Sequence, residues 1–260
     1  MSDCLETFRN TGIEPLPDEA ACPVCGWFDV AHPDVQRILR RRDSQGRLNL
    51  LYVAQCKCRL VAQEQQAKAG LRAQQANLPH PQTPRTFDNF QARPGTEQML
   101  AAAQRFVERQ GPRILVFCGG YGGGKSHLVE AIGRAVLEQG RSVRYEFITD
   151  LFVRLRHTYS RPEDQEDLFD VLAWYQRMDT LLLDDNVRAN PTDWETEQIT
   201  SLVDERLRNQ RRLALATNDD HQTFLRKLGP RLASRLFQSD PAVDGVQVVP
   251  VTARDYRRNP

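Results

Sequence analysis

Eight consecutive residues, 119–126, read Gly-Gly-Tyr-Gly-Gly-Gly-Lys-Ser and constrain the fold more than any other segment. An apolar run at 113–118 precedes them, and an amphipathic helix is predicted to follow over 125–139. Glycines in such a loop let backbone N–H groups turn inward around phosphate oxygens, at a helix N-terminus that carries partial positive charge. The spacing Gly-x4-Gly-Lys-Ser, in this strand-loop-helix context, therefore predicts an ATP-binding loop instead of an ordinary glycine-rich turn.

The two polar residues that close this loop have separate predicted roles. Lys125 is expected to reach the β and γ phosphates, and the Ser126 hydroxyl is expected to ligate Mg²⁺. The predicted nucleotide-binding set covers the loop and the position after it: Gly119, Gly120, Tyr121, Gly122, Gly123, Gly124, Lys125, Ser126 and His127.

Polar residues also follow two later apolar runs. Asp184 and Asp185 come directly after the run 181–183, and Asn218 comes after the run 213–216. We assign Asp184 to the Mg²⁺ shell and Asp185 to the attacking water, since paired acids at a strand tip suit both tasks. Asn218 is a candidate contact to the γ-phosphate or the water. Turn capping is the alternative for all three residues.

The order of the predicted elements fixes the fold class. Helices are predicted at 97–110, 125–139, 150–178 with a break near 160–162, and 194–209; strands are predicted at 113–118, 143–147, 180–183, 213–216 and 245–251. Strands that alternate with helices indicate an α/β domain in which a parallel sheet lies between helices.

The N-terminal third has a different composition. Cys22, Cys25, Cys56 and Cys58 supply four thiolates from two tight turns, which suits a structural Zn²⁺ site. Cys4 and His32 are substitute ligands, and reduced core cysteines are the alternative. A polar helix over 59–77 and a linker at 78–84, with three prolines in seven residues, follow. The predicted domains are a zinc module at 1–60, a helix and linker at 61–85, and an ATPase domain at 86–260.

The overall charge and hydropathy limit the partners. The formal net charge is +1, so any nucleic-acid contact is expected to be local. No secretory signal and no apolar run of membrane-spanning length is present, which predicts a soluble, cytoplasmic protein without a membrane partner.

The order of phosphate loop, paired acids and Thr-Asn strand tip, followed by Arg-Leu-Ala-Ser-Arg-Leu at 231–236, resembles AAA+ ATPases. More narrowly, it resembles the bacterial replicative helicase loaders of the DnaC/DnaI class over about residues 86–260. Thr-Phe-Asp-Asn-Phe at 86–90 is similar to the signature that lies near the adenine in that class. The N-terminal cysteines favour the DnaI-like branch, and the short segment after residue 235 is similar to the loaders' core without a helical lid.

The resemblance implies further roles. Arg235 would be an arginine finger that reaches the γ-phosphate of a neighbouring subunit, so ATP would drive self-association. The partners would be the replicative hexameric helicase, gripped by the zinc module and the following helix, and single-stranded DNA. The family commonly has Glu where this chain has Asp185, which implies slow hydrolysis.

An inserted helical element contacts single-stranded DNA in the resembled class. The matching region here carries several basic side chains and one aromatic ring, although 163–170 is acidic, so a solvated helix remains the alternative. The candidate residues are Arg154, Arg156, His157, Tyr159 and Arg161.

Three other functions share these motifs. An IstB-like transposition helper ATPase has almost the same core. A small-molecule kinase has the same loop but does not need Asn218 together with Arg235. A nucleotide-gated adaptor would bind ATP without hydrolysing it, which the shorter Asp185 side chain allows.

Overall fold

The computed structural model of this chain describes residues 58–158, 168–184, 192–224, 226, 227, 229, 245–253 and 255. It divides into two units between Ala69 and Gly70, inside helix α3 (Cys58–Ala76), and the unit that begins at Gly70 is described here by itself. Several predicted functional residues lie outside the described ranges, so their roles stay predictions: Cys22, Cys25, Cys56, Tyr159, Arg161, Asp185 and Arg235. The side chain of Cys58 is likewise not described.

Five strands form one parallel sheet in the order β2-β3-β4-β1-β5. In the central register, Ile114 lies opposite Leu213 on one side and Val246 on the other. The predicted parallel α/β sheet is therefore confirmed. The strands are β1 (Ile114–Cys118), β2 (Val143–Phe147), β3 (Thr180–Asp184), β4 (Arg212–Thr217) and β5 (Val246–Pro250).

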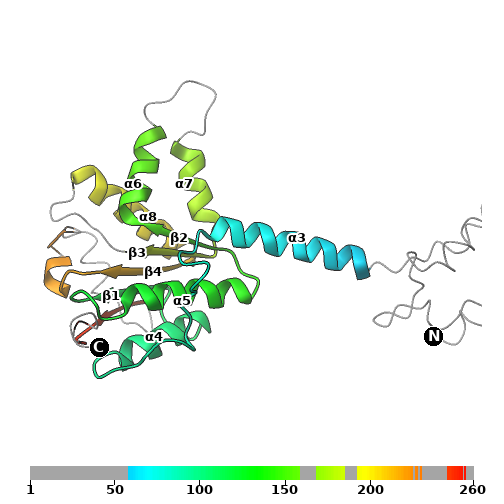
Figure 1. The fold of residues 1–260 in the computed structure, drawn as a ribbon. Coiled ribbons are helices and arrows are strands. Elements are labelled where there is room, and N and C mark those ends of the chain that lie inside the picture. The colour runs from blue at the N-terminus through cyan, green and yellow to red at the C-terminus, as the bar shows by residue number, and fades with distance from the viewer. Residues whose placement is uncertain are drawn as a thin grey trace, which may run out of the picture. The chain divides into compact units, whose positions relative to one another are not determined.

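Helices cover both faces of the sheet (Figure 1). Helices α4 (Glu97–Val107) and α5 (Lys125–Glu138) lie on one face, whereas α6 (Ile148–His157), α7 (Leu168–Arg177) and α8 (Asp193–Arg208) lie on the other. Alternate residues of β1 enter opposite cores, since Leu115 and Phe117 pack with α4 and α5 while Ile114 and Val116 pack with the second group. No helix of the described ranges combines the length and apolar character needed to cross a membrane.

Two helix boundaries differ from the predicted ones for local reasons. Helix α4 ends at Val107 instead of 110 because Arg109 adopts a left-handed φ of 60°, which a helix cannot continue. Helix α8 begins with a capping box, in which Thr192 accepts from the Glu195 backbone and the Glu195 carboxylate accepts from the Thr192 backbone. The predicted helical stretch 150–178 contains α6 and α7, and α6 starts two residues earlier.

Candidate nucleotide-binding site

The loop between β1 and α5 contains two glycines at which both the backbone angle and the neighbouring chain exclude a side chain. Gly119 has a φ of 146°, and a Cβ there would lie 2.4 Å from the Val251 carbonyl oxygen. Gly124, the N-cap of α5, is left-handed with a φ of 85°, and a Cβ there would lie 2.8 Å from the Phe90 ring. The loop thus approaches neighbouring chain too closely for any side chain. The first N–H groups of α5 have no partner within the helix, so they are available to an anion.

Lys125 is held by loop and strand-tip oxygens. Its side chain is 4% exposed, and its Nζ donates to the Gly119 and Gly120 carbonyls at 2.8 and 2.7 Å. A third bond runs to Asn218 Oδ1 at 2.9 Å, which connects the start of α5 with the residue that follows β4. A buried ammonium with three oxygen acceptors is already arranged for exchange with phosphate oxygens.

Ser126 and Asp184 form the second half of the site. Ser126 Oγ donates to Asp184 Oδ1 at 3.0 Å, across 58 residues of sequence. The hydroxyl of buried Tyr145 donates to the other carboxylate oxygen, Oδ2. Burial, then the Asp184 charge, raises the pKa of Tyr145, so the phenol stays a donor. A hydroxyl and an oriented carboxylate are hard oxygen ligands that fit Mg²⁺, and Tyr145 would hold the carboxylate in place.

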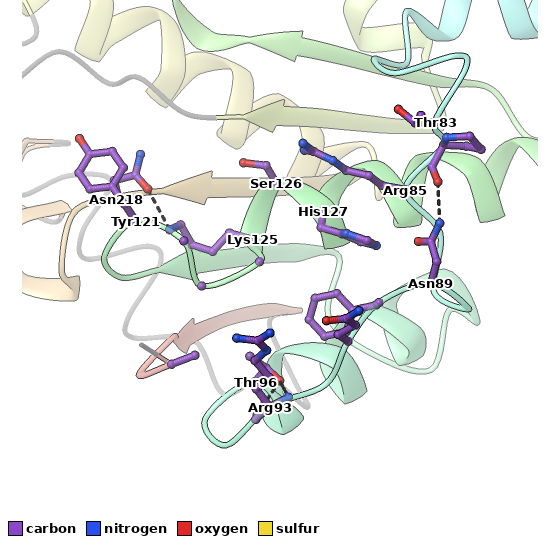
Figure 2. A pocket seen from close by; sticks show the side chains of 17 residues that line it. Thr83, Arg85, Asn89, Arg93, Thr96, Tyr121, Lys125, Ser126, His127 and Asn218 are labelled. Carbon is purple, nitrogen blue, oxygen red and sulfur yellow. Dashed lines mark hydrogen bonds between the residues drawn. The ribbon is translucent and has the colours of Figure 1, made fainter. Parts of the chain in front are cut away.

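A cavity of about 770 Å³ extends from the loop toward the segment 83–96 (Figure 2). The view places Lys125 and Asn218 at one end and Arg85 and Asn89 at the other, with His127 between them. Asn89 braces its own segment, since its Nδ2 donates to the Pro84 carbonyl and its Oδ1 accepts from the Thr86 backbone. The volume suits a nucleotide, because ligand cavities span roughly 300 to 1,000 Å³.

The His127 ring is fixed at the middle of this cavity. Its Nε2 lies 2.9 Å from the Thr86 carbonyl, which can only accept, so Nε2 carries a hydrogen. The Phe90 ring packs edge-on against it at 5.2 Å between centroids. Burial lowers the pKa of His127, so the ring is held in its neutral form at pH 7.

The proline-rich segment is attached to α5 through one carboxylate. Glu130 is fully buried and accepts from the backbone of Arg85 at 3.2 Å and from Arg134 at 2.5 Å, and it lies 2.9 Å from His80 Nδ1. Arg134 also donates to the Pro79 carbonyl at 2.7 Å. Because Thr83 and Arg85 line the cavity, this carboxylate positions part of the cavity wall.

The structure brings together most of the predicted site residues that it describes. Residues 121–127 and Asn218 line the cavity, while Gly119 and Gly120 contribute carbonyls to Lys125. Tyr121 is the most exposed of these lining residues, at 66%. Sequence reasoning missed Tyr145 and Glu130; the alternation along β2 was the available signal for Tyr145.

The two predicted DNA-contacting arginines that the structure describes, Arg154 and Arg156, have partners within the protein. Arg156 forms an ion pair with Glu195 at 2.8 Å and stacks over Trp194. Arg154 lies over the Trp174 ring at 5.0 Å and donates to the Tyr175 hydroxyl. Both guanidinium groups therefore brace α6 against α7 and α8, which the sequence did not indicate.

Comparison with known proteins agrees with this geometry. The family model described as IstB-like ATP binding protein matches residues 44–259. The chain belongs to the IstB-like ATP binding protein family. The family name denotes ATP binding, and the loop at the tip of β1 is the described segment whose geometry fits a phosphate.

Relatives of two kinds resemble this IstB-like chain. The replicative helicase loader DnaC of Buchnera aphidicola (subsp. Schizaphis graminum) is 26% identical over 206 residues, which cover 77% of this chain and 80% of the loader. An insertion sequence ATP-binding protein of Sinorhizobium fredii is 32% identical over 187 residues, covering 71% of this chain and 60% of that protein.

A solved structure confirms the fold. The replication initiator DnaA bound to AMPPCP and single-stranded DNA superposes with a TM-score of 0.56 at 21% identity, over 67% of this chain. The IstB-like chain spans about half the length of that initiator, 51%. The chain thus shares its α/β core with that initiator, which agrees with the parallel α/β fold that the sequence predicted.

Proposed function

We propose that this protein is an ATP-dependent loader of the replicative DNA helicase that acts in the cytoplasm during replication initiation. The observation that carries the proposal is the joining of three strand tips around one cavity, through Lys125–Asn218 and Ser126–Asp184. The 26% identity to a helicase loader over most of both chains supports the choice among ATPases.

Each end of the cavity has a proposed role in holding MgATP. Lys125 and the first N–H groups of α5 would bind the phosphates, while Ser126 and Asp184 would hold Mg²⁺, which neutralises charge on the β and γ phosphates. The nucleobase end would lie toward Asn89 and Phe90, at the signature segment 86–90. Asn218 would sense the γ-phosphate through its bond to Lys125.

Hydrolysis depends on two residues outside the described ranges. Asp185 would orient the attacking water from the end of β3, and its short side chain predicts slow turnover. Arg235 would act on the γ-phosphate of a neighbouring subunit, so ATP would favour self-association. Single-stranded DNA would contact the region from Arg154 to Arg161. Arg156 and His157 are the exposed basic residues that α6 offers there, and Arg156 is paired with Glu195.

The N-terminal module is proposed to bind Zn²⁺ through Cys22, Cys25, Cys56 and Cys58 and to grip the helicase. The described residues hold no cluster of metal-binding side chains, and three of these four cysteines lie outside them. A purified fragment of residues 1–60 should lose its fold in strong chelator; a fragment that stays folded would remove zinc from the proposal.

A transposition helper ATPase is the second candidate. The family model carries the IS21 insertion sequence in its name, and the 32% identical relative is an insertion sequence protein. Both candidates use the same nucleotide site, so that site does not separate them.

One experiment separates the candidates. The full chain is mixed with its host's replicative hexameric helicase, with and without ATP, and both the mass of the complex and DNA unwinding are measured. A loader forms an ATP-dependent complex and increases unwinding, and Lys125→Ala should lack the ATP dependence. A helper forms no complex under either condition, and that result would overturn the loader.

A further inference from the structure

Charged residues gather at the amino-terminal end of the sheet, where its parallel strands begin, opposite the nucleotide cavity. Every strand from β1 to β4 begins at this edge, and a charged residue lies just before or at each start. These are Arg113 before β1, Arg141 before β2, Asp179 before β3, and Arg211 and Arg212 at the start of β4.

Part of this positive charge has a structural role. Arg206 is fully buried and donates to the backbone carbonyls of Tyr175, Met178, Asp179 and Arg212 at 2.8 to 3.1 Å. Arg212 donates to the Phe106 and Pro112 carbonyls at 2.7 and 3.2 Å. Helices α4 and α7 end near these carbonyls, and guanidinium groups satisfy such helix ends.

The remaining charge is not balanced. Arg109 and Arg141 share one carboxylate, Asp179, at 2.6 and 3.4 Å, and the Arg109 side chain is 53% exposed. Among the described residues, Glu108 and Glu138 end the neighbouring helices but form no ion pair with these arginines.

The arginines also act on one another. Burial, followed by the charges of Arg109 and Arg141, lowers the pKa of Arg212 to about 10. Such self-repulsion costs stability in the isolated protein and is relieved when an anion binds.

We propose that the partly exposed residues Arg109, Arg113, Arg141 and Arg211, here termed the arginine edge, bind the phosphate backbone of duplex DNA. This surface is separate from the nucleotide site and does not depend on the loader role. Guanidinium groups match phosphate oxygens in geometry and charge.

Among the described residues, the exposed aromatic side chains lie away from these arginines, which favours a duplex over a single strand. Sequence-independent binding of single strands uses aromatic rings beside the cations. The exposed large apolar side chains of the described ranges lie elsewhere, at Leu71, Tyr121, Phe147, Val153 and Phe169. A duplex presents rigid rows of phosphates, with one charge per about 1.7 Å of its axis. Cationic side chains alone are enough to bind them.

The test measures binding of a fluorescent mixed-sequence duplex of about 30 base pairs to the full chain, between 50 and 200 mM salt. The double variant Arg109→Ala/Arg211→Ala removes one exposed and one partly buried cation, and Arg109→Lys/Arg211→Lys keeps their charge. Arg226→Ala is the control, because Arg226 is exposed beyond the opposite, nucleotide-binding end of the sheet and binds Thr223. A single strand of the same sequence is titrated in parallel.

The expected result is a lower salt dependence. Loss of two phosphate contacts reduces the slope of log affinity against log salt by about 1.8, so the fourfold salt change costs about tenfold less affinity in the alanine variant. The lysine variant and Arg226→Ala keep the wild-type slope. Unchanged duplex binding in the folded alanine variant, or a loss confined to the single strand, would overturn the arginine edge.

Discussion

The two ends of the central sheet differ in how many oxygen partners their positively charged side chains have and in how exposed these side chains are. At the carboxyl end, the single ammonium of Lys125 meets three oxygen acceptors and is almost fully buried. At the amino end, several guanidinium groups surround the one carboxylate of Asp179, and Arg109 is half exposed. The first arrangement can exchange its own oxygens for phosphate oxygens, whereas the second needs an external anion. The same fold thus presents one enclosed and one open anion-binding edge.

The largest expected effect concerns Arg206, and it tests whether the buried arginine at the amino end has a structural role. Arg206→Ala removes a buried guanidinium that donates to four backbone carbonyls, of which those of Tyr175 and Asp179 keep a backbone donor, and should lower the free energy of unfolding by about 4 kcal/mol. Denaturant unfolding of the full chain measures it. The control is Arg208→Ala, whose exposed pair with Glu205 should contribute less than about 0.5 kcal/mol. Equal losses in the two variants would mean that the buried guanidinium is not a structural element.

The next effect tests whether the two ends act independently. Lys125→Ala removes the buried cation and should weaken MgATP binding about 100-fold, measured by calorimetry, because charge-assisted bonds contribute up to about 3 kcal/mol. Lys227→Ala, a cation at the same end that pairs with Asp219, should change the affinity less than about threefold. The duplex affinity of Lys125→Ala should match that of wild type. If duplex affinity fell together with MgATP affinity, the two ends of the sheet would not be independent binding sites.

The sequence predicted the carboxyl end far better than the amino end. A phosphate loop and acidic strand tips follow local patterns, since glycine conformations and strand ends are set by near neighbours. Tyr145 and Glu130 were not predicted because their partners are distant in the sequence. Asp184 lies 39 residues from Tyr145, and His80 lies 50 residues from Glu130. The sequence did not predict the arginine edge because three of its members are single charges before three different strands and the fourth, Arg109, follows α4. Only the sheet order β2-β3-β4-β1-β5 brings them together.

A smaller effect concerns the wall of the cavity at the carboxyl end. Glu130→Gln keeps the size of the side chain but weakens its bonds to Arg134 and His80, which should cost about 2 kcal/mol of stability. Because Thr83 and Arg85 line the cavity, MgATP affinity should fall about fivefold as their segment loosens. Glu138→Gln, an exposed change on the same helix, is the control. A stability loss with wild-type nucleotide affinity would show that the segment does not shape the site.

The smallest effect is a pH dependence of stability, and it tests whether the His127 ring in the nucleotide cavity is shielded from water. Burial lowers the pKa of His127 in the folded chain, whereas the unfolded chain keeps the ordinary value near 6.5. As the pH falls through 6.5, the unfolded chain takes up a proton that the folded chain resists, so wild type loses stability. His127→Gln retains a donor for the Thr86 carbonyl but has no titrating ring. Denaturant unfolding at pH 7.5 and 5.8 should therefore show a greater fall for wild type than for the variant. Parallel falls would mean that water reaches the ring freely, and the cavity would then be an open groove at its middle.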